Sequence, residues 1–254
     1  MADNSESPNL DFIREKENTI SSYELDIEWK KLSQKWLLHA FRKRYMYNFE
    51  SLGRPIIQTP IDIVAMQELI WTVQPDLIIE TGIAHGGSLI FSASMLELNA
   101  ACGGPQNAEV LGVDIDIRAH NKAAIEAHPM FKRISMIQGS SIDPEIIQQV
   151  TTKAQGKQSI LVCLDSNHTH EHVLAELEAY APLTSVGSYC VVFDTVIEDM
   201  PDDMFPNRPW GPGNNPKTAV WEYLKIHSEF QIDKSLQHKL LITVAPDGFL
   251  KRLK

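Results

Sequence analysis

Two acids and a histidine follow apolar runs in the second half of the chain. Asp165 closes the run 160–165, His168 comes three residues later, and Asp194 closes the run 188–194. Two carboxylates brought together repel each other unless a proton or a cation lies between them, and oxygen ligands suit Mg²⁺ or Ca²⁺. We therefore predict that Asp165 and Asp194 bind a divalent metal ion.

His168 has the type and spacing of a general base beside that metal. A metal that chelates neighbouring oxygens of an alcohol aligns it and lowers its pKa, and an imidazole can then remove the proton. We assign catalytic roles to His168 and Asp165, and expect His170 and His172 on the surface of the following helix. Two alternatives stay open: His168 only starts that helix, or it forms a zinc site with His172, although no HExxH motif is present.

The first half of the chain carries an acid just before a glycine-rich turn. An acid there would repel a pyrophosphate, whereas a cationic sulfonium with an amino-acid tail fits it. Ala84 also breaks the GxGxxG fingerprint of dinucleotide binding. The turn therefore favours a sulfonium nucleoside, bound by Glu80, Thr81, Gly82, Gly86, Gly87 and Ser88.

Further strand ends complete the predicted cofactor site. Asp114 ends the second apolar run, where its carboxylate can accept hydrogen bonds from both ribose hydroxyls, although it could instead cap the next helix. Gly139, Ser140 and Ser141 end the third run and could meet the adenine edge. Asp165, at the fourth strand end, borders the same crevice. Each of these is an ordinary turn by itself, and the prediction depends on their falling at successive strand ends.

A long irregular stretch, 208–216, follows the fifth run and is rich in Gly, Pro and Asn. Loops of this kind cover active sites, are disordered, or are plain connections. Arg208 and Trp210 offer a cation and an apolar plane, and Asn214 and Asn215 offer amides for a sugar. We favour a cover over the acceptor.

Apolar runs that alternate with amphipathic stretches must position these residues. The pattern predicts an α/β fold with a doubly wound, mostly parallel sheet, in which ligands bind beyond the carboxyl ends of the strands. We expect strands at 77–80, 110–114, 134–138, 160–165, 188–194 and 240–245.

The chain divides by pattern into a helical appendage, 1–59, and a catalytic domain, 60–254. Residues 1 to about 20 are polar and expected to fray, and a helix is expected over 23–47. That helix either packs on the main domain or serves as a subunit contact or acceptor-site lid. Its apolar positions are Leu25, Trp29, Leu32, Trp36 and Leu37.

Composition limits the function further. With 254 residues, 43% of them hydrophobic, the chain can bury one substantial core. A net charge of −10 excludes a protein that coats nucleic acid. The three cysteines form no CxxC pair, and neither a signal peptide nor a membrane span is recognisable, so we expect a soluble, cytoplasmic protein with no membrane partner.

Seven short motifs combine into one family resemblance. They are LGRPI at 52–56, PID at 60–62, QELI at 67–70, PDLIIETG at 75–82, GGS at 86–88, GVDI at 112–115 and NNPKTAV at 214–220. Singly most are unspecific, but together they resemble the cephalosporin hydroxylase and rhamnosyl O-methyltransferase family. This resemblance covers about 52–224.

The resemblance implies a Rossmann-like class I methyltransferase fold, S-adenosylmethionine as the methyl donor, a Mg²⁺-type site and homo-oligomers. It implies that Asp165 and Asp194 bind the metal and that His168 is the base. The family has an acidic pair at the fifth strand end, whereas here Phe193 precedes Asp194, and a water or Ser166 could fill the gap. Among members of the family, the chain resembles those that methylate a nucleotide-activated deoxysugar such as TDP-rhamnose in calicheamicin-type antibiotic biosynthesis.

Two other functions remain to be compared with this one. The family's other name suggests an oxygenase, which needs two histidines and a carboxylate at one iron; the single HxE motif, 227–229, lies far along the chain from the strand-end acids. A nucleotide-binding partner without turnover is the second alternative, for which Phe193 is the best support.

Overall fold

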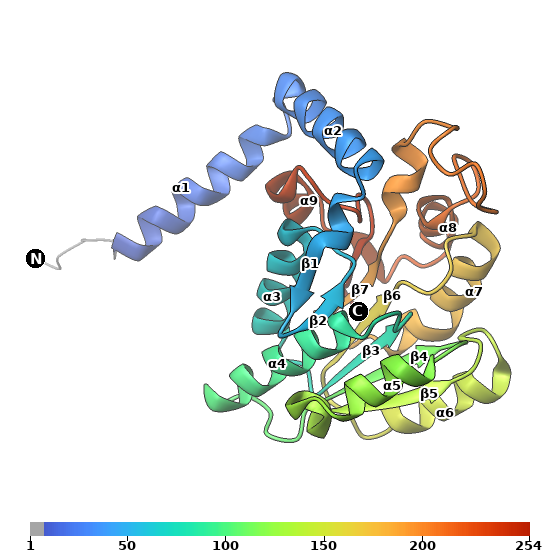
Figure 1. The fold of residues 1–254 in the computed structure, drawn as a ribbon. Coiled ribbons are helices and arrows are strands. Elements are labelled where there is room, and N and C mark those ends of the chain that lie inside the picture. Colours follow the sequence, from blue (N-terminus) through green and yellow to red (C-terminus); the bar gives the residue numbers. More distant parts are fainter. Residues whose placement is uncertain (1–7) are drawn as a thin grey trace, which may run out of the picture.

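A seven-stranded sheet runs through the centre of the computed structural model, which describes residues 8–254 (Figure 1). The strand order is β5-β4-β3-β6-β7-β9-β8. The first five of these pair in parallel, and β9 pairs antiparallel with both β7 and β8. The strands are β3 Leu77–Thr81, β4 Glu109–Asp114, β5 Ile134–Gln138, β6 Ile160–Leu164, β7 Tyr189–Val192, β8 Phe230–Ile232 and β9 Phe249–Arg252. The predicted α/β class with a doubly wound, mostly parallel sheet is confirmed.

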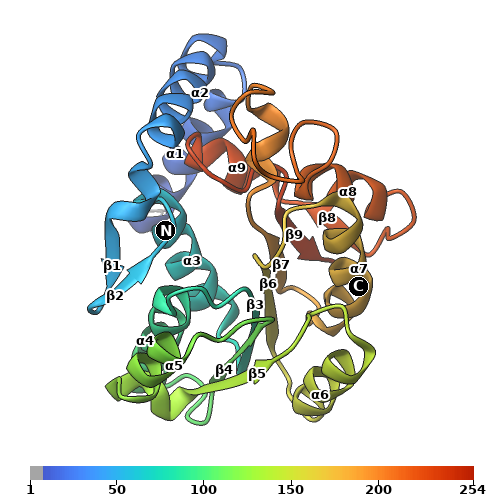
Figure 2. The ribbon, with the colours of Figure 1, turned by 45° about the vertical axis from the view of Figure 1, so that its right-hand side comes forward.

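Helices cover both faces of the sheet (Figure 2). One face carries α3 (Pro60–Val73), α4 (Gly87–Ala101) and α5 (Ala119–Glu126), and the other carries α6 (Pro144–Ala154), α7 (His170–Tyr180) and α8 (Pro216–Tyr223). The strands are therefore apolar on both faces, and successive side chains enter opposite core layers. For example, Ile78 packs in the layer with α3 and α4, and Ile79 in the layer with α6 and α7.

Helix starts follow from local capping chemistry. Thr59, Asp143 and Asn215 each accept a hydrogen bond from a backbone N–H of the first turn of α3, α6 and α8, and each is followed by proline at the first helical position. A side-chain acceptor satisfies one of the free N–H groups of a helix start, and proline there loses no hydrogen bond. These caps fix where the loops beyond the strands end.

The strand ends that carry polar residues are neighbours in space. Thr81 of β3 is in register with Leu164 of β6, and Leu164 is in register with Val192 of β7. The chain order reverses between β3 and β6, and ligands of open α/β sheets bind at such a switch point. Asp165 and Asp194, which follow β6 and β7, therefore lie beside the turn that follows β3.

The N-terminal region differs from the single helix expected over 23–47. The chain is helical from Pro8 instead of frayed, in α1 (Pro8–Tyr23), and begins a second helix, α2 (Ile27–Arg42), because the side chain of Asp26 accepts a hydrogen bond from Trp29 N and caps it. A short 3-10 helix, η1 (Tyr45–Asn48), and the hairpin of β1 (Phe49–Ser51) and β2 (Arg54–Ile56) follow. The expectation for residues 1–7 lies outside the described residues, and the division at residue 59 stays a prediction.

The strand expected over 240–245 is wrong. The helix α9 (Lys234–Leu240) reaches into this run, and Leu241 has a positive φ of 56°. The edge of β7 is occupied by β9, so the apolar run has no strand to pair with. Instead, the hydroxyl of Thr243 and the backbone N–H of Val244 donate hydrogen bonds to the carboxylate of Asp62 in α3.

Within residues 8–254, none of the helices combines the length and the apolar character needed to cross a bilayer.

Candidate active site

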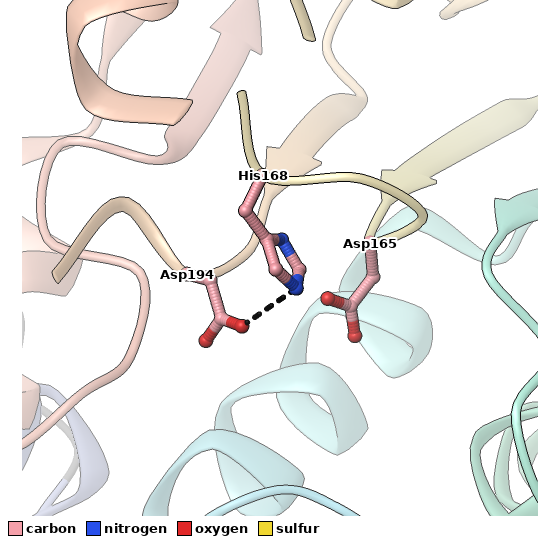
Figure 3. A group of neighbouring side chains, drawn as sticks. All are labelled: Asp165, His168 and Asp194. Atoms are coloured by element: carbon pink, nitrogen blue, oxygen red, sulfur yellow. Dashed lines mark ion pairs between the residues drawn. The ribbon is translucent and has the colours of Figure 1, made fainter. Parts of the chain in front are cut away.

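Asp165, His168 and Asp194 come together at the ends of β6 and β7 (Figure 3). Their potential ligand atoms all lie within 4.8 Å of one another, and they form the single such group among the described His, Cys, Asp and Glu side chains. His168 Nε2 is 3.2 Å from Asp194 Oδ2, and the Asp165 carboxylate faces the same imidazole edge. The two loops thus bring together the three residues that the sequence analysis singled out.

The electrostatics of this group fit a divalent cation. Burial raises the pKa of Asp165 well above its usual value, and the negative charges of Asp194, Glu80 and Glu176 raise it further. Three carboxylates that repel a fourth need a proton or a metal ion among them. The carboxylates of Asp165 and Asp194 are oxygen ligands of the kind that Mg²⁺, Ca²⁺ and Mn²⁺ prefer, so these two residues fit the metal.

Among the described residues, no fourth side chain takes the place of the acid that the family resemblance led us to expect before Asp194. Phe193 is only 3% exposed and packs in the core. Ser166 donates a hydrogen bond to Glu176 Oε1 at 2.7 Å and lies beside His172, so its hydroxyl serves α7. Oxygens of water or of the substrate would therefore have to complete the coordination sphere of an ion held by Asp165 and Asp194.

Only one nitrogen of His168 is available for chemistry. Nδ1 is buried with no hydrogen-bond partner in the described part of the chain, whereas Nε2 faces Asp194. The Trp210 ring packs edge-on against the imidazole, with centroids 4.8 Å apart. This packing fixes the ring so that Nε2 points between the two carboxylates.

The other histidines of this region serve α7 and its surroundings. His170 contacts Thr218 and Glu222, and His172 contacts Ser141, Ser166 and Glu176, so both are half-buried contacts of the helix and not free surface residues. His172 is absent from the group that can hold a metal, which removes the zinc alternative for residues 168 and 172.

The HxE motif likewise forms no iron site. His227 stacks on Tyr223 and is bonded to Glu229 and Glu178, and no described residues but Asp165, His168 and Asp194 form a possible metal group.

The glycine-rich turn after β3 lies against Asp165. Gly82 has φ +90°, and a Cβ there would stand 2.1 Å from the backbone oxygen of Asp165. Glu80 is 4% exposed and accepts a hydrogen bond from Ser88 Oγ. Burial raises the pKa of Glu80 to about 7, and the bond from Ser88 opposes that rise. A buried carboxylate without a cation suits a positively charged ligand.

Asp114 holds this turn in place. Its Oδ2 accepts hydrogen bonds from the backbone N–H groups of Ile83 and Ala84, at 2.8 and 3.2 Å, and its Oδ1 accepts one from Asp116 N. A carboxylate has about four acceptor positions. Asp114 therefore fixes the turn with most of its capacity and keeps about one position for a ribose hydroxyl, instead of the two that the sequence suggested.

Two residues that the sequence analysis missed support the same turn. Arg54 of β2 donates to the carbonyl of His85 and to Asn121 Oδ1, and Asn121 donates to the carbonyl of Ala84. Ala84 has a positive φ of 46°. The family motif at 52–56 was visible, but the contact of the hairpin with the turn depends on packing.

The predicted adenine edge is tied to α7 by a second missed network. Ser141 is 4% exposed, and its hydroxyl lies 3.0 Å from His172 Nε2. His172 and Ser166 connect it to Glu176, whose side chain is fully buried. Gly139 packs against Ile146, and the neighbouring Ser140 is half-buried. The loop after β5 is thus fixed relative to the loop after β6.

The 208–216 loop reaches His168, but its asparagines serve the loop itself. Asn214 accepts a hydrogen bond from His170 N and donates to the carbonyl of Pro209, and Asn215 is fully buried as the cap of α8. Asn215 therefore drops out of the substrate-contacting set, because helix capping takes its side chain. Trp210 covers His168, and Arg208 lies over the Trp210 ring at 5.0 Å.

A cavity of about 930 Å³ lies beside the segment that follows Asp194, although Asp165, His168 and Asp194 themselves do not line it. It lies between α2, α9 and the 3-10 helix η4 (Thr195–Asp199), which begins directly after Asp194. Its walls combine apolar and polar side chains, including Leu37, Val196, Asp199, Lys217, His238 and Thr243. The N-terminal helix α2 thus forms part of the space beside the candidate site.

Comparisons with known proteins identify a family. Residues 43–253 match the family model described as rhamnosyl O-methyltransferase/CmcI. A rhamnosyl O-methyltransferase from Mycobacterium tuberculosis is 34% identical over 194 residues, which cover 75% of this chain and 73% of that protein. One from Mycobacterium leprae is 30% identical over 224 residues, which cover 85% and 90%.

Solved structures show the same fold. The structure named cmcI-N160 SAH superposes with a TM-score of 0.56 at 19% identity, covering 82% of this chain and 84% of that one. The structure named cmcI-D160 Mg-SAM superposes with a TM-score of 0.53 at 19% identity, covering 82% and 78%.

Proposed function

This chain belongs to the rhamnosyl O-methyltransferase/CmcI family, and we propose that it transfers a methyl group from S-adenosylmethionine to a sugar hydroxyl with the help of a divalent metal. The observation that carries the proposal is the convergence of Asp165, His168 and Asp194 within 4.8 Å beside the turn after β3. Relatives named for rhamnosyl O-methylation and a CmcI structure with Mg and SAM support the acceptor class, the donor and Mg²⁺.

Asp165 and Asp194 hold the metal in this proposal. When bound, a divalent ion supplies a Lewis acid that lowers the pKa of a coordinated hydroxyl. The two carboxylates orient the acceptor at the ends of β6 and β7, and alignment of the reacting atoms is a large part of catalysis by proximity. His168 Nε2, held between them, accepts the hydroxyl proton.

The donor occupies the other side of the switch point. The sulfonium is an already activated methyl donor, so the chain has only to place it. Glu80 supplies a buried negative charge for the positively charged part, and Thr81, Gly82, Gly86, Gly87 and Ser88 shape the turn around it. Asp114 accepts a ribose hydroxyl and the loop with Gly139, Ser140 and Ser141 borders the adenine.

For the acceptor we propose a nucleotide-activated deoxysugar such as TDP-rhamnose, used in natural-product biosynthesis of the antibiotic type. The sugar would lie under the loop in which Trp210 packs on His168 and Arg208 lies over the Trp210 ring; Asn214, which accepts a hydrogen bond from His170 N, holds this loop against α7. The cavity beside η4 offers room for the part of the substrate beyond the sugar ring.

The experiment incubates the purified chain with S-adenosylmethionine, Mg²⁺ and a panel of nucleotide sugars and simple rhamnosides, and follows the products by intact mass. A mass gain of one methyl group that EDTA abolishes and Mg²⁺ restores is the expected result. Turnover that persists in EDTA would overturn the metal role alone. Donor binding with no transfer to any sugar would instead favour a nucleotide-binding partner.

We also propose that the chain forms a homo-oligomer in a reducing, cytoplasmic setting. Large apolar side chains on α2, Trp29, Leu32 and Trp36, are more than 40% exposed, which is typical of a contact between subunits. Cys102, Cys163 and Cys190 are all free.

A further inference from the structure

A buried aspartate of α3 lies behind the candidate metal site and has no part in the mechanism above. Asp62 is 0% exposed in the first turn of α3, and no cationic side chain in the described part of the chain pairs with it. A buried carboxylate without a cation is costly unless hydrogen bonds satisfy it. Its position therefore calls for a specific explanation.

Three donors satisfy this carboxylate, and two of them come from one distant segment. Thr59 Oγ1 donates to Oδ2 at 2.8 Å as part of the helix cap. Thr243 Oγ1 donates to Oδ1 at 2.5 Å, and Val244 N donates to Oδ2 at 3.0 Å. Asp62 thus holds segment 243–248, which follows α9 and is not part of a strand.

The same segment holds the chain on both sides of Asp194. Val192 N donates to the carbonyl of Gly248 at 2.8 Å before it. After it, Thr195 Oγ1 donates to the carbonyl of Pro246 at 2.6 Å and Val196 N donates to that of Val244 at 3.2 Å. Asp194 itself has φ 55°, in the left-handed region. A non-glycine residue stays in that region when its surroundings fix it.

We propose that Asp62 is a positioning residue, which fixes the carboxylate of Asp194 for metal binding through segment 243–248. This inference rests on the proposed role of Asp194 as a metal ligand. The orientation of Asp194 matters strongly in this chain because Phe193 is not an acid, so Asp165 and Asp194 are the two carboxylates of the candidate metal site among the described residues. With two carboxylates, the affinity for the ion depends on the orientation of each. Residues hydrogen-bonded to metal ligands change metal affinity about 10- to 100-fold when mutated, and the connection from Asp62 through segment 243–248 should act at the lower end of that range.

The electrostatics of Asp62 agree with this placement. Burial raises its pKa to about 6, the hydrogen bonds from Thr243, Val244 and Thr59 oppose that rise, and the negative charge of Asp194 adds to it. The charge of Asp194 therefore acts on Asp62, although the two side chains come from different elements.

The test measures Mn²⁺ binding to the full chain by calorimetry and by electron paramagnetic resonance, in wild type, Asp62→Asn and Thr243→Val. Both variants should weaken Mn²⁺ binding, Asp62→Asn by about 10-fold or more, and leave the dissociation constant for S-adenosylhomocysteine within about twofold. The double variant should bind Mn²⁺ no more weakly than Asp62→Asn alone, because both changes break one connection. Thr243→Val keeps the test decisive if Asp62→Asn does not fold.

Asp76→Asn is the matched control. Asp76 accepts hydrogen bonds from the backbone N–H groups of Gln158 and Ser159. It directly precedes β3, at the end of the strands opposite to the candidate site. Its replacement should lower the melting temperature without changing Mn²⁺ affinity. If Asp62→Asn and Thr243→Val behave in the same way as this control, Asp62 is only structural and the inference is overturned.

A second readout separates this inference from the proposed function. The Nε2 resonance of His168 in nitrogen-15 spectra reports the contact with Asp194 and needs no metal. It should shift in Asp62→Asn and Thr243→Val but not in Asp76→Asn. A wild-type chain that binds no Mn²⁺ but shows this pattern would refute the metal role and keep the positioning role, whereas an unshifted resonance would refute the positioning role.

Discussion

Nε2 of His168 lies 3.2 Å from Asp194 Oδ2 and faces the place where an alcohol would lose its proton in the proposed mechanism. Replacing His168 with alanine removes that acceptor, so kcat should fall by at least about 10- to 1,000-fold. Donor binding should not change, because the side chain lies on the metal side of the switch point. His120→Ala, at an exposed position of α5, is the control. Initial-rate kinetics and calorimetry with S-adenosylhomocysteine measure the two quantities, and an unchanged kcat would remove His168 from the mechanism.

Glu80 makes the stability of the chain depend on pH. Burial raises its pKa from 4.5 to about 7, so the folded chain binds this proton more tightly than the unfolded chain does. The free energy of unfolding should therefore fall as pH rises from about 4.5 to 7, by an amount on the order of 3 kcal/mol from this group.

Glu80→Gln should remove most of that dependence, be more stable than wild type at pH 8, and bind the positively charged donor more weakly. Urea unfolding at pH 5 and pH 8 together with donor calorimetry tests this. Ser88→Ala, which keeps the carboxylate and removes its hydrogen bond, should keep the pH dependence. A parallel loss in both variants would contradict the assignment to Glu80.

At the scale of elements, the turn after β3 depends on a glycine that no other residue can replace. A Cβ at Gly82 would meet the backbone oxygen of Asp165 at 2.1 Å, in addition to the strain of φ +90°. Gly103 has φ +94° with nothing within 4 Å of its position, so Gly103→Ala measures the strain alone, about 1 kcal/mol.

Gly82→Ala should cost about 1–3 kcal/mol more than Gly103→Ala, because the strand ends that carry the donor and metal sites must move apart. It should also weaken both donor and Mn²⁺ binding. Equal losses of unfolding free energy in the two variants would show that the turn and the loop after β6 are not packed as tightly as described.

At the scale of the whole molecule, α2 carries large apolar side chains that the described residues leave partly exposed. Leu32 is 58% exposed, next to Trp29 and Trp36 at 41% each. If α2 is a subunit contact, Leu32→Glu should place a charge in it and shift the chain to a smaller species in analytical ultracentrifugation. Ile226→Glu, at an isolated side chain that is 77% exposed, should leave the mass unchanged. An unchanged mass in both would exclude α2 as the contact.

Local pattern alone predicts the five parallel strands and the acids at their ends. Strands buried on both faces are continuous apolar runs, and parallel strands have their carboxyl ends on the same side of the sheet, so local pattern was enough to place Glu80, Asp114, Asp165 and Asp194 at the ends of neighbouring strands. It also identified His168, because that residue follows Asp165 within the same short loop.

The hydrogen-bond partners of several polar residues could be known only from the folded chain. The apolar run at 240–245 fits a strand locally, but β9 takes the edge of β7, and the donors of the run go to Asp62. Asn215 caps α8 instead of contacting a substrate. Arg54, in the hairpin of β1 and β2, donates a hydrogen bond to the carbonyl of His85 in the turn after β3. Such choices depend on competition between partners distant in the chain for the same hydrogen bonds, and no local pattern contains that competition.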